Sequence, residues 1–143
     1  MGTNYYFTTD TCPMCGHSAT KIHIGKSSAG WCFALAIHPE LGINSLADWE
    51  EFWQSKIGVI RNEYGELLTN DQMVDIITNR SWDLEWTEER SQNPPLGYTS
   101  WYEFLKENYA IRGPNGLLRA EIREGHCISH GDGTYDLCIG EFS

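Results

Sequence analysis

The chain has 143 residues, enough for one domain with one modest hydrophobic core. A hydrophobic content of 41% and an aromatic content of 13% are typical of a globular protein and exclude a disordered one. No apolar run approaches the roughly 20 residues of a membrane helix, and residues 1–10 lack the features of a signal or transit peptide. We therefore expect a cytoplasmic protein with no membrane association.

The formal net charge of −10 is concentrated in the middle of the chain. Residues 40–110 carry fourteen Asp and Glu against five Lys and Arg, whereas residues 1–39 carry two Lys against one Asp. This acidity excludes non-specific nucleic-acid binding by the whole surface, because phosphate contacts need Lys and Arg. It is typical of a solvated face that aids solubility, or of a face that contacts a basic surface on a partner protein.

Three strand patterns precede residue 40: Asn4–Thr8, Lys21–Gly25 and Trp31–His38, with residues 26–29 as the turn between the last two. In the third strand, large apolar side chains alternate with small or polar ones. The second set consists of Cys32, Ala34, Ala36 and His38. One face of this strand is therefore expected to leave room for another group to approach.

Cys12 and Cys15 have the spacing of a zinc knuckle, in which two thiolates converge on one ion. A four-residue turn at residues 26–29 would place His23 opposite Cys32, with His38 further along the same face. The predicted zinc ligands are Cys12, Cys15, His23 and His38, with Cys32 and His17 as alternatives for the fourth position. Such a closed site would be structural. The competing interpretation, a thioredoxin-like redox pair, would require a βαβ context that the pattern does not show.

The segment Gly25–Ser28 has part of the composition of a phosphate-binding loop but lacks the upstream glycine and the following helix. The simpler interpretation is a hairpin turn. Backbone N–H groups and side chains near the zinc site would still be able to hold an anion or a nucleotide. The candidate residues are Lys26, Ser27, Ser28 and Trp31.

The acidic middle of the chain predicts three short amphipathic helices. Ser45 begins the first, which ends near Gly58, and Thr69 or Asn70 begins the second. Ser100, followed by Glu103, begins the third. Between the first two helices a short strand and a turn are expected at residues 59–65. Residues 81–98 show no regular pattern.

The tail predicts a strand at Leu117–Ile122 and a hairpin at His126–Ile139, with Asp132-Gly133 as its two-residue turn. This register pairs Cys127 with Cys138 and His130 with Tyr135. Cys127, His130 and Cys138 form a second candidate metal site. The alternative interpretation is that the two thiols are small buried hydrophobic groups, and their position as a hydrogen-bonded pair disfavours a disulfide.

These elements predict a single α+β domain built from three consecutive parts. Residues 1–39 form a zinc-knuckle and β-hairpin module, residues 40–110 an acidic helical part, and residues 111–143 a C-terminal β-hairpin.

The run Cys12-Pro-Met-Cys-Gly and the later His23-Ile-Gly-Lys-Ser-Ser-Ala-Gly-Trp31 resemble an uncharacterised family of small proteins of tailed phages and prophages. Looser similarity extends to Asn62–Glu66 and to the terminal Gly140–Ser143. The resemblance implies a phage origin and the cytoplasm of an infected bacterium. It implies no activity.

Three functions are compatible with this sequence. The first is a zinc-binding accessory protein that binds a host or phage protein and inhibits a defence or replication enzyme. The second is nucleic-acid or nucleotide binding through the zinc module and the Gly25–Ser28 loop. The third is a metal-dependent hydrolase, for which the sequence offers no evident general base and hence no catalytic residue.

Overall fold

The computed structural model describes residues 2–9, 21–28, 30–81, 97–122 and 127–139. The fold is α+β, as the sequence predicts. The strands are β1 (Gly2–Thr8), β2 (Lys21–Ser28), β3 (Phe33–Ala36), β4 (Val59–Asn62), β5 (Leu67–Leu68), β6 (Ala110–Arg112), β7 (Leu118–Ala120), β8 (Cys127–His130) and β9 (Tyr135–Cys138). The helices are α1 (Leu46–Ser55), α2 (Asn70–Thr78) and α3 (Trp101–Glu107), with 3₁₀ turns at Pro39–Leu41 and Pro114–Gly116.

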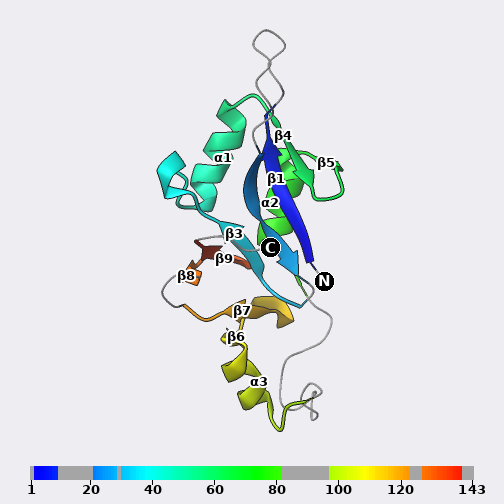
Figure 1. The fold of residues 1–143 in the computed structure, drawn as a ribbon, viewed down its shortest axis with the longest axis vertical. Helices are drawn as coiled ribbons and strands as arrows, with labels where there is room; N and C mark the ends of the chain where they lie inside the picture. Colours follow the sequence, from blue (N-terminus) through cyan, green and yellow to red (C-terminus); the bar gives the residue numbers. More distant parts are fainter. Residues whose placement is uncertain (1, 10–20, 29, 82–96, 123–126, 140–143) are drawn as a thin grey trace.

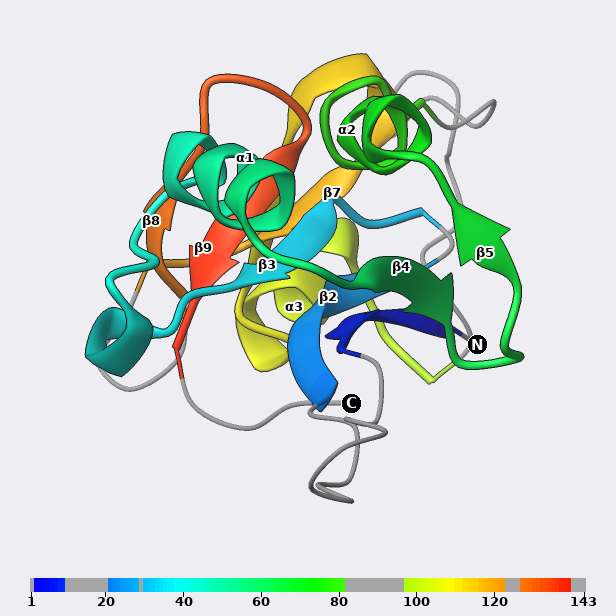
Figure 2. The same ribbon diagram turned by 90° about the horizontal axis from the view of Figure 1, so that it is seen from above.

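One seven-stranded sheet has the strand order β5-β4-β1-β2-β3-β9-β8, and β6 and β7 pair in a second, two-stranded sheet. The molecule is elongated, with α3, β6 and β7 at one end of the long axis (Figure 1). Helices α1 and α2 lie over one face of the large sheet (Figure 2), whereas α3 lies beyond the sheet along the long axis (Figure 1). None of the described helices has the length and apolar character needed to cross a membrane.

The hydrophobic core lies between the large sheet and the two helices α1 and α2. Trp49 of α1 is fully buried, and its Nε1 donates a hydrogen bond of 2.7 Å to the carbonyl oxygen of Ala36 on β3. This bond satisfies the one polar atom of a large buried ring. The other fully buried core side chains come from β1–β4, α2 and the segment before α1: Phe7, Ile24, Phe33, Leu35, Ile43, Ile60, Met73 and Ile77.

The predicted N-terminal ends of the three helices are confirmed. The hydroxyl oxygens of Ser45 and Ser100 accept hydrogen bonds from the backbone N–H groups three residues later, as N-caps do. Thr69 and Gln72 form a complete capping box at the start of α2. Helix α1 ends at Ser55, slightly before the predicted Gly58.

The predicted register between β2 and β3 is wrong. Strand β2 continues to Ser28, and the Trp31 N–H donates to the Ser28 carbonyl oxygen over 3.0 Å, so the chain turns later than predicted. Gly30 makes this later turn possible with a left-handed φ of 81°. Lys26 therefore pairs with Ala34, and His23 does not lie opposite Cys32.

The C-terminal hairpin joins the large sheet, because β9 pairs in parallel with β3. Phe33 lies beside Tyr135, and Ala36 lies beside Cys138. The sequence pattern predicts a separate C-terminal hairpin and gives no sign of this pairing. It brings the end of the chain next to the small-residue face of β3.

Within the hairpin, the predicted pairing of Cys127 with Cys138 is confirmed. The predicted pairing of His130 with Tyr135 is wrong, since His130 lies opposite Asp136. A register shift between Cys127 and Ser129 and a longer turn, closed by the Gly131 N–H donating to the Tyr135 carbonyl oxygen, cause the difference. The shift moves His130 to the face that carries the two thiols.

The small sheet is attached to the turn between β2 and β3. The Leu118 N–H donates to the Gly30 carbonyl oxygen over 2.8 Å, and the Cys32 N–H donates to the Leu118 carbonyl oxygen over 2.6 Å. Strand β6 and its pairing with β7 were not predicted. This attachment places β7 and the end of α3 against the outer face of the large sheet.

Candidate metal site and ligand pocket

The N-terminal zinc site is only partly within the described residues. Cys12, Cys15 and His17 lie outside them, so the knuckle stays a prediction. His23 and His38 are neighbours, since the His38 Nε2 donates to the His23 carbonyl oxygen over 2.8 Å. This contact places the His38 ring against the main chain of His23, and the role of the two imidazoles as zinc ligands stays a prediction. The register that made Cys32 an alternative fourth ligand is not the one observed.

Both imidazoles have polar partners. His23 Nε2 lies 2.9 Å from Asn4 Oδ1, which accepts its hydrogen, and burial lowers the pKa of His23. His38 Nδ1 lies 3.5 Å from Glu40 Oε1. Because a carbonyl oxygen only accepts, Nε2 of His38 carries the proton, and its Nδ1 has the free lone pair when the ring is neutral. A neutral imidazole with one free nitrogen is the form that binds zinc.

A cluster of metal-binding side chains occupies the C-terminal hairpin. One ligand atom from each of Cys127, His130 and Asp136 lies within 4.8 Å of the others. Cys127 is fully buried and Asp136 nearly so. Two members of this hairpin cluster were predicted. The third predicted member, Cys138, is paired with Cys127 across the hairpin and is buried as well.

Asp136 is the member that the sequence analysis left out of the site, and it is the centre of a hydrogen-bond network. Its Oδ1 accepts from Arg119 Nε over 2.9 Å, and its Oδ2 accepts from the Ala120 N–H over 3.0 Å. Burial nevertheless raises the pKa of Asp136, and the bonds from Ala120 and Arg119 oppose that rise. An Asp at an inward position of an otherwise apolar strand was the available signal, because a buried carboxylate needs partners.

The two hairpin thiols interact with each other. The Cys138 S–H donates to the Cys127 sulfur, which lowers the pKa of Cys127 and raises that of Cys138. Burial adds to the rise at Cys138. Cys127 is thus the thiol of the pair that ionises first, and the thiolate is the form that binds metal ions.

A pocket of about 200 Å³ lies beside the hairpin cluster, between the outer face of the large sheet and the segment from α3 to β7. Three of the four predicted anion-binding residues line it: Lys26, Ser28 and Trp31. Ser27 falls between Lys26 and Ser28 in β2, so it points to the opposite face of the strand. Asp136 and Cys138 line the same pocket and connect it to the hairpin cluster.

Comparison with protein families, with curated protein sequences and with solved structures finds no match to this chain. The resemblance to phage proteins therefore stays a prediction from the motifs, and the function must be argued from the geometry.

Proposed function

We propose that this protein is a zinc-binding protein that acts by binding another protein. The proposed zinc site rests on three side chains of one hairpin whose ligand atoms lie within 4.8 Å of one another: Cys127, His130 and Asp136. Sulfur, imidazole and carboxylate are the three ligand types that zinc takes in proteins. A tetrahedral site needs a fourth ligand, and Cys138 lies directly opposite Cys127.

The charges of this set fit a divalent cation. Two thiolates and one carboxylate are balanced in part by Arg119, which leaves two negative charges for the ion to neutralise. Without the cation the two thiols keep their protons and Asp136 stays paired with Arg119, so the two negative charges appear only with the ion. Zinc binding would also remove the protons from both thiols, since the ligands bind in their ionised forms.

The hydrogen bonds already present are compatible with a bound ion. His130 Nε2 donates to the Ala120 carbonyl oxygen over 2.8 Å and lies 3.9 Å from Asp136 Oδ1, so this bond holds the ring beside the carboxylate. Each oxygen of Asp136 accepts one bond, and a carboxylate has about four lone-pair positions in total. Arg119 and Ala120 would therefore orient the carboxylate and leave room for the ion.

The role of such an ion is structural. Strand β8 is an end strand of the large sheet and has only β9 as its neighbour. A metal held by both strands would fix this edge, and the bonds from Asp136 and His130 to residues 119 and 120 would extend the link to β7. The same reasoning applies to the N-terminal knuckle, where Cys12, Cys15, His23 and His38 remain the predicted zinc ligands.

The metal part is tested by counting zinc in purified protein and comparing two cysteine variants. Cys127→Ser should lower the zinc content by one ion per chain, whereas Cys32→Ser, which removes a buried thiol outside the hairpin cluster, should leave it unchanged. Substitution with cobalt adds a second readout, because thiolate ligands give it an intense near-ultraviolet absorption band. An equal zinc content in all three proteins would contradict the hairpin site, and a cooperative melt of unchanged midpoint after chelation would contradict its structural role.

The protein-binding part is favoured by an acidic groove between β5 and α2. The groove has a volume of about 360 Å³ and combines Glu66 and Asp75 with the apolar side chains of Leu67, Leu68 and Ile76. Strand β5 ends the large sheet as far as residues 2–9, 21–28, 30–81, 97–122 and 127–139 define it, so its outer edge is a candidate for pairing with an added strand. The matching partner is an extended segment rich in Lys and Arg, from a host or phage protein in the bacterial cytoplasm.

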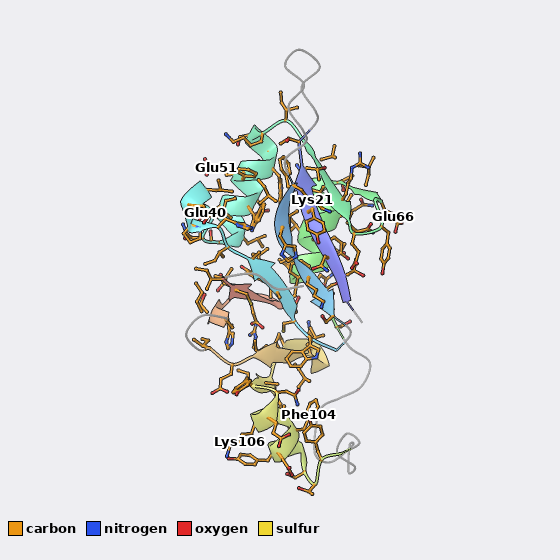
Figure 3. All side chains as sticks on the ribbon, viewed as in Figure 1. Lys21, Glu40, Glu51, Glu66, Phe104 and Lys106 are labelled. Atoms are coloured by element: carbon orange, nitrogen blue, oxygen red, sulfur yellow. The ribbon has the colours of Figure 1, made fainter. Side chains whose placement is uncertain are left out.

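Two charge reversals test this surface. Glu66 lies beside the groove, whereas Glu51 lies across the molecule on α1 (Figure 3). Glu66→Lys should abolish capture of the partner from bacterial lysate, and Glu51→Lys should not. Failure to capture any specific partner from several hosts, or equal loss in both variants, would overturn this part of the proposal.

A further inference from the structure

The pocket beside the hairpin cluster has the features of a small-molecule site, and these features do not depend on a metal. It is hollow because small side chains form part of its wall. Ala34 lies between Lys26 on β2 and Asp136 on β9 in one row across the large sheet. Ala120 lines the pocket from β7. Larger residues at either alanine position would fill the space.

Two aromatic residues line the pocket from different elements. Trp31 follows the turn after β2, and Tyr109 follows α3. Tyr109 has a left-handed φ of 52°, a conformation that costs about 1 kcal/mol for a residue with a Cβ. Its carbonyl oxygen accepts from the Glu121 N–H over 2.7 Å, which helps to hold it there. Strained residues of this kind are found at ligand sites.

The β2 side of the pocket carries a positive charge. Lys26 and the hydroxyl group of Ser28 come from the same face of β2. The facing carboxylate, Asp136, is paired with Arg119, so it does not cancel the charge of Lys26. Glu121, the other charged group that lines the pocket, is solvent-exposed and lies across from β2 on the end of β7. The β2 side therefore favours an anion.

We propose that this pocket binds a planar aromatic ring carrying one anionic group, with the ring between Trp31 and Tyr109 and the anion at Lys26 and Ser28. Aromatic side chains bind planar ligands by stacking, and an ammonium group pairs with carboxylate or phosphate. Drug-sized ligands occupy pockets of roughly 300 Å³ or more. The smaller volume here matches a ring with its anionic group. Aromatic carboxylates and nucleoside monophosphates share this chemistry, and the volume favours the carboxylates because a nucleoside monophosphate adds a ribose between ring and anion.

Calorimetric titration of the purified protein with indole-3-carboxylate and with AMP tests the inference and distinguishes the two sources. Lys26→Met should weaken binding by at least about tenfold, the usual effect of losing a charged hydrogen bond. Lys21→Met is the matched control, since Lys21 lies on the same strand but packs 4.1 Å over the Tyr6 ring. In Figure 3, Lys21 is well separated from Phe104 and Lys106 of α3 along the long axis.

A second variant separates binding from folding. Tyr109→Gly removes the ring at a backbone position that favours glycine, so it should weaken binding, and urea denaturation of the same variant confirms that it is folded. Indole-3-carboxamide, which has the ring without the charge, should bind at least about tenfold more weakly than the carboxylate. The inference is overturned if neither anion binds at millimolar concentration, if the neutral amide binds as tightly, or if Lys21→Met and Lys26→Met have equal effects. Zinc content is unaffected by these outcomes, so they do not decide the proposed metal site.

Discussion

Arg119 on β7 and Asp136 on β9 form a buried ion pair, with Arg119 Nε 2.9 Å from Asp136 Oδ1. The guanidinium group also donates through Nη2 to the carbonyl oxygens of Gly133 and Tyr135. One side chain of the small sheet thus binds both the carboxylate and the turn of the C-terminal hairpin. The pair adds a side-chain link between the two sheets, and Asp136 belongs both to the hairpin cluster and to the lining of the pocket.

We predict that Asp136→Asn lowers the free energy of unfolding by about 3–5 kcal/mol, because it leaves the Arg119 charge buried without a counter-ion. Urea denaturation in the presence of a chelator measures this effect with any metal contribution removed. Glu121→Gln, which removes an exposed carboxylate in the same region, should change stability by less than about 0.5 kcal/mol.

The double variant Arg119→Met/Asp136→Asn provides the decisive comparison. Removing both charges should cost less than the sum of the two single substitutions, because neither charge is then left alone. Additive effects would show that the two groups do not interact.

The sequence predicted those parts of the fold that depend on neighbouring residues. Caps at Ser45, Thr69 and Ser100 define the helices through bonds that span three residues, so their positions are readable without tertiary structure. The pairing of Cys127 with Cys138 follows from a nearby turn. The register of β2 and β3 was missed because Gly30, rather than the Lys26–Ser28 segment, sets the turn.

The candidate site was predicted in part for the same reason. His130 and the two thiols belong to one hairpin and were recognised from local pattern. Asp136 lies two residues before Cys138 on β9 and so shares its face, whereas His130 reached that face only because of the irregular register in β8. Arg119 and the parallel pairing of β9 with β3 depend on contacts far apart in the chain, for which the sequence carries no local signal.

A substitution at Gly25 tests the close approach of β3 to β2 that follows from the observed register. A Cβ at this position would overlap the Ala34 carbonyl oxygen and the Phe33 ring. Gly25→Ala should therefore destabilise the protein by about 3 kcal/mol, as expected for overpacking against backbone. Gly42→Ala is the control, because Gly42 has a left-handed φ of 76° but open space around it, and strain alone costs about 1 kcal/mol. Equal thermal midpoints for the two variants would contradict the close approach of β3 to Gly25.

Thr69 tests the contribution of the capping box to α2. Its hydroxyl oxygen accepts from the Gln72 N–H over 3.1 Å, and the Gln72 Oε1 accepts from the Thr69 N–H over 2.8 Å. Thr69→Ala should cost about 1 kcal/mol of stability, measured by urea denaturation. Thr69→Ser, which keeps the hydroxyl group, should recover most of the loss. A serine variant as unstable as the alanine variant would show that the methyl group matters more than the cap.

The Cys32 thiol predicts how stability changes in alkaline solution. Burial raises its pKa to about 11 from the ordinary value of 9.0, so the unfolded chain loses this proton at lower pH than the folded protein does. The contribution of the buried thiol is complete below about pH 9 and is lost as the pH rises towards 11. The difference in unfolding free energy between the wild type and Cys32→Ser should therefore shift against the wild type between about pH 9 and pH 11, with a chelator present in both series. A pH-independent difference would mean that the thiol ionises equally easily in the folded and unfolded states. Cys32 would then not be buried as the structure places it.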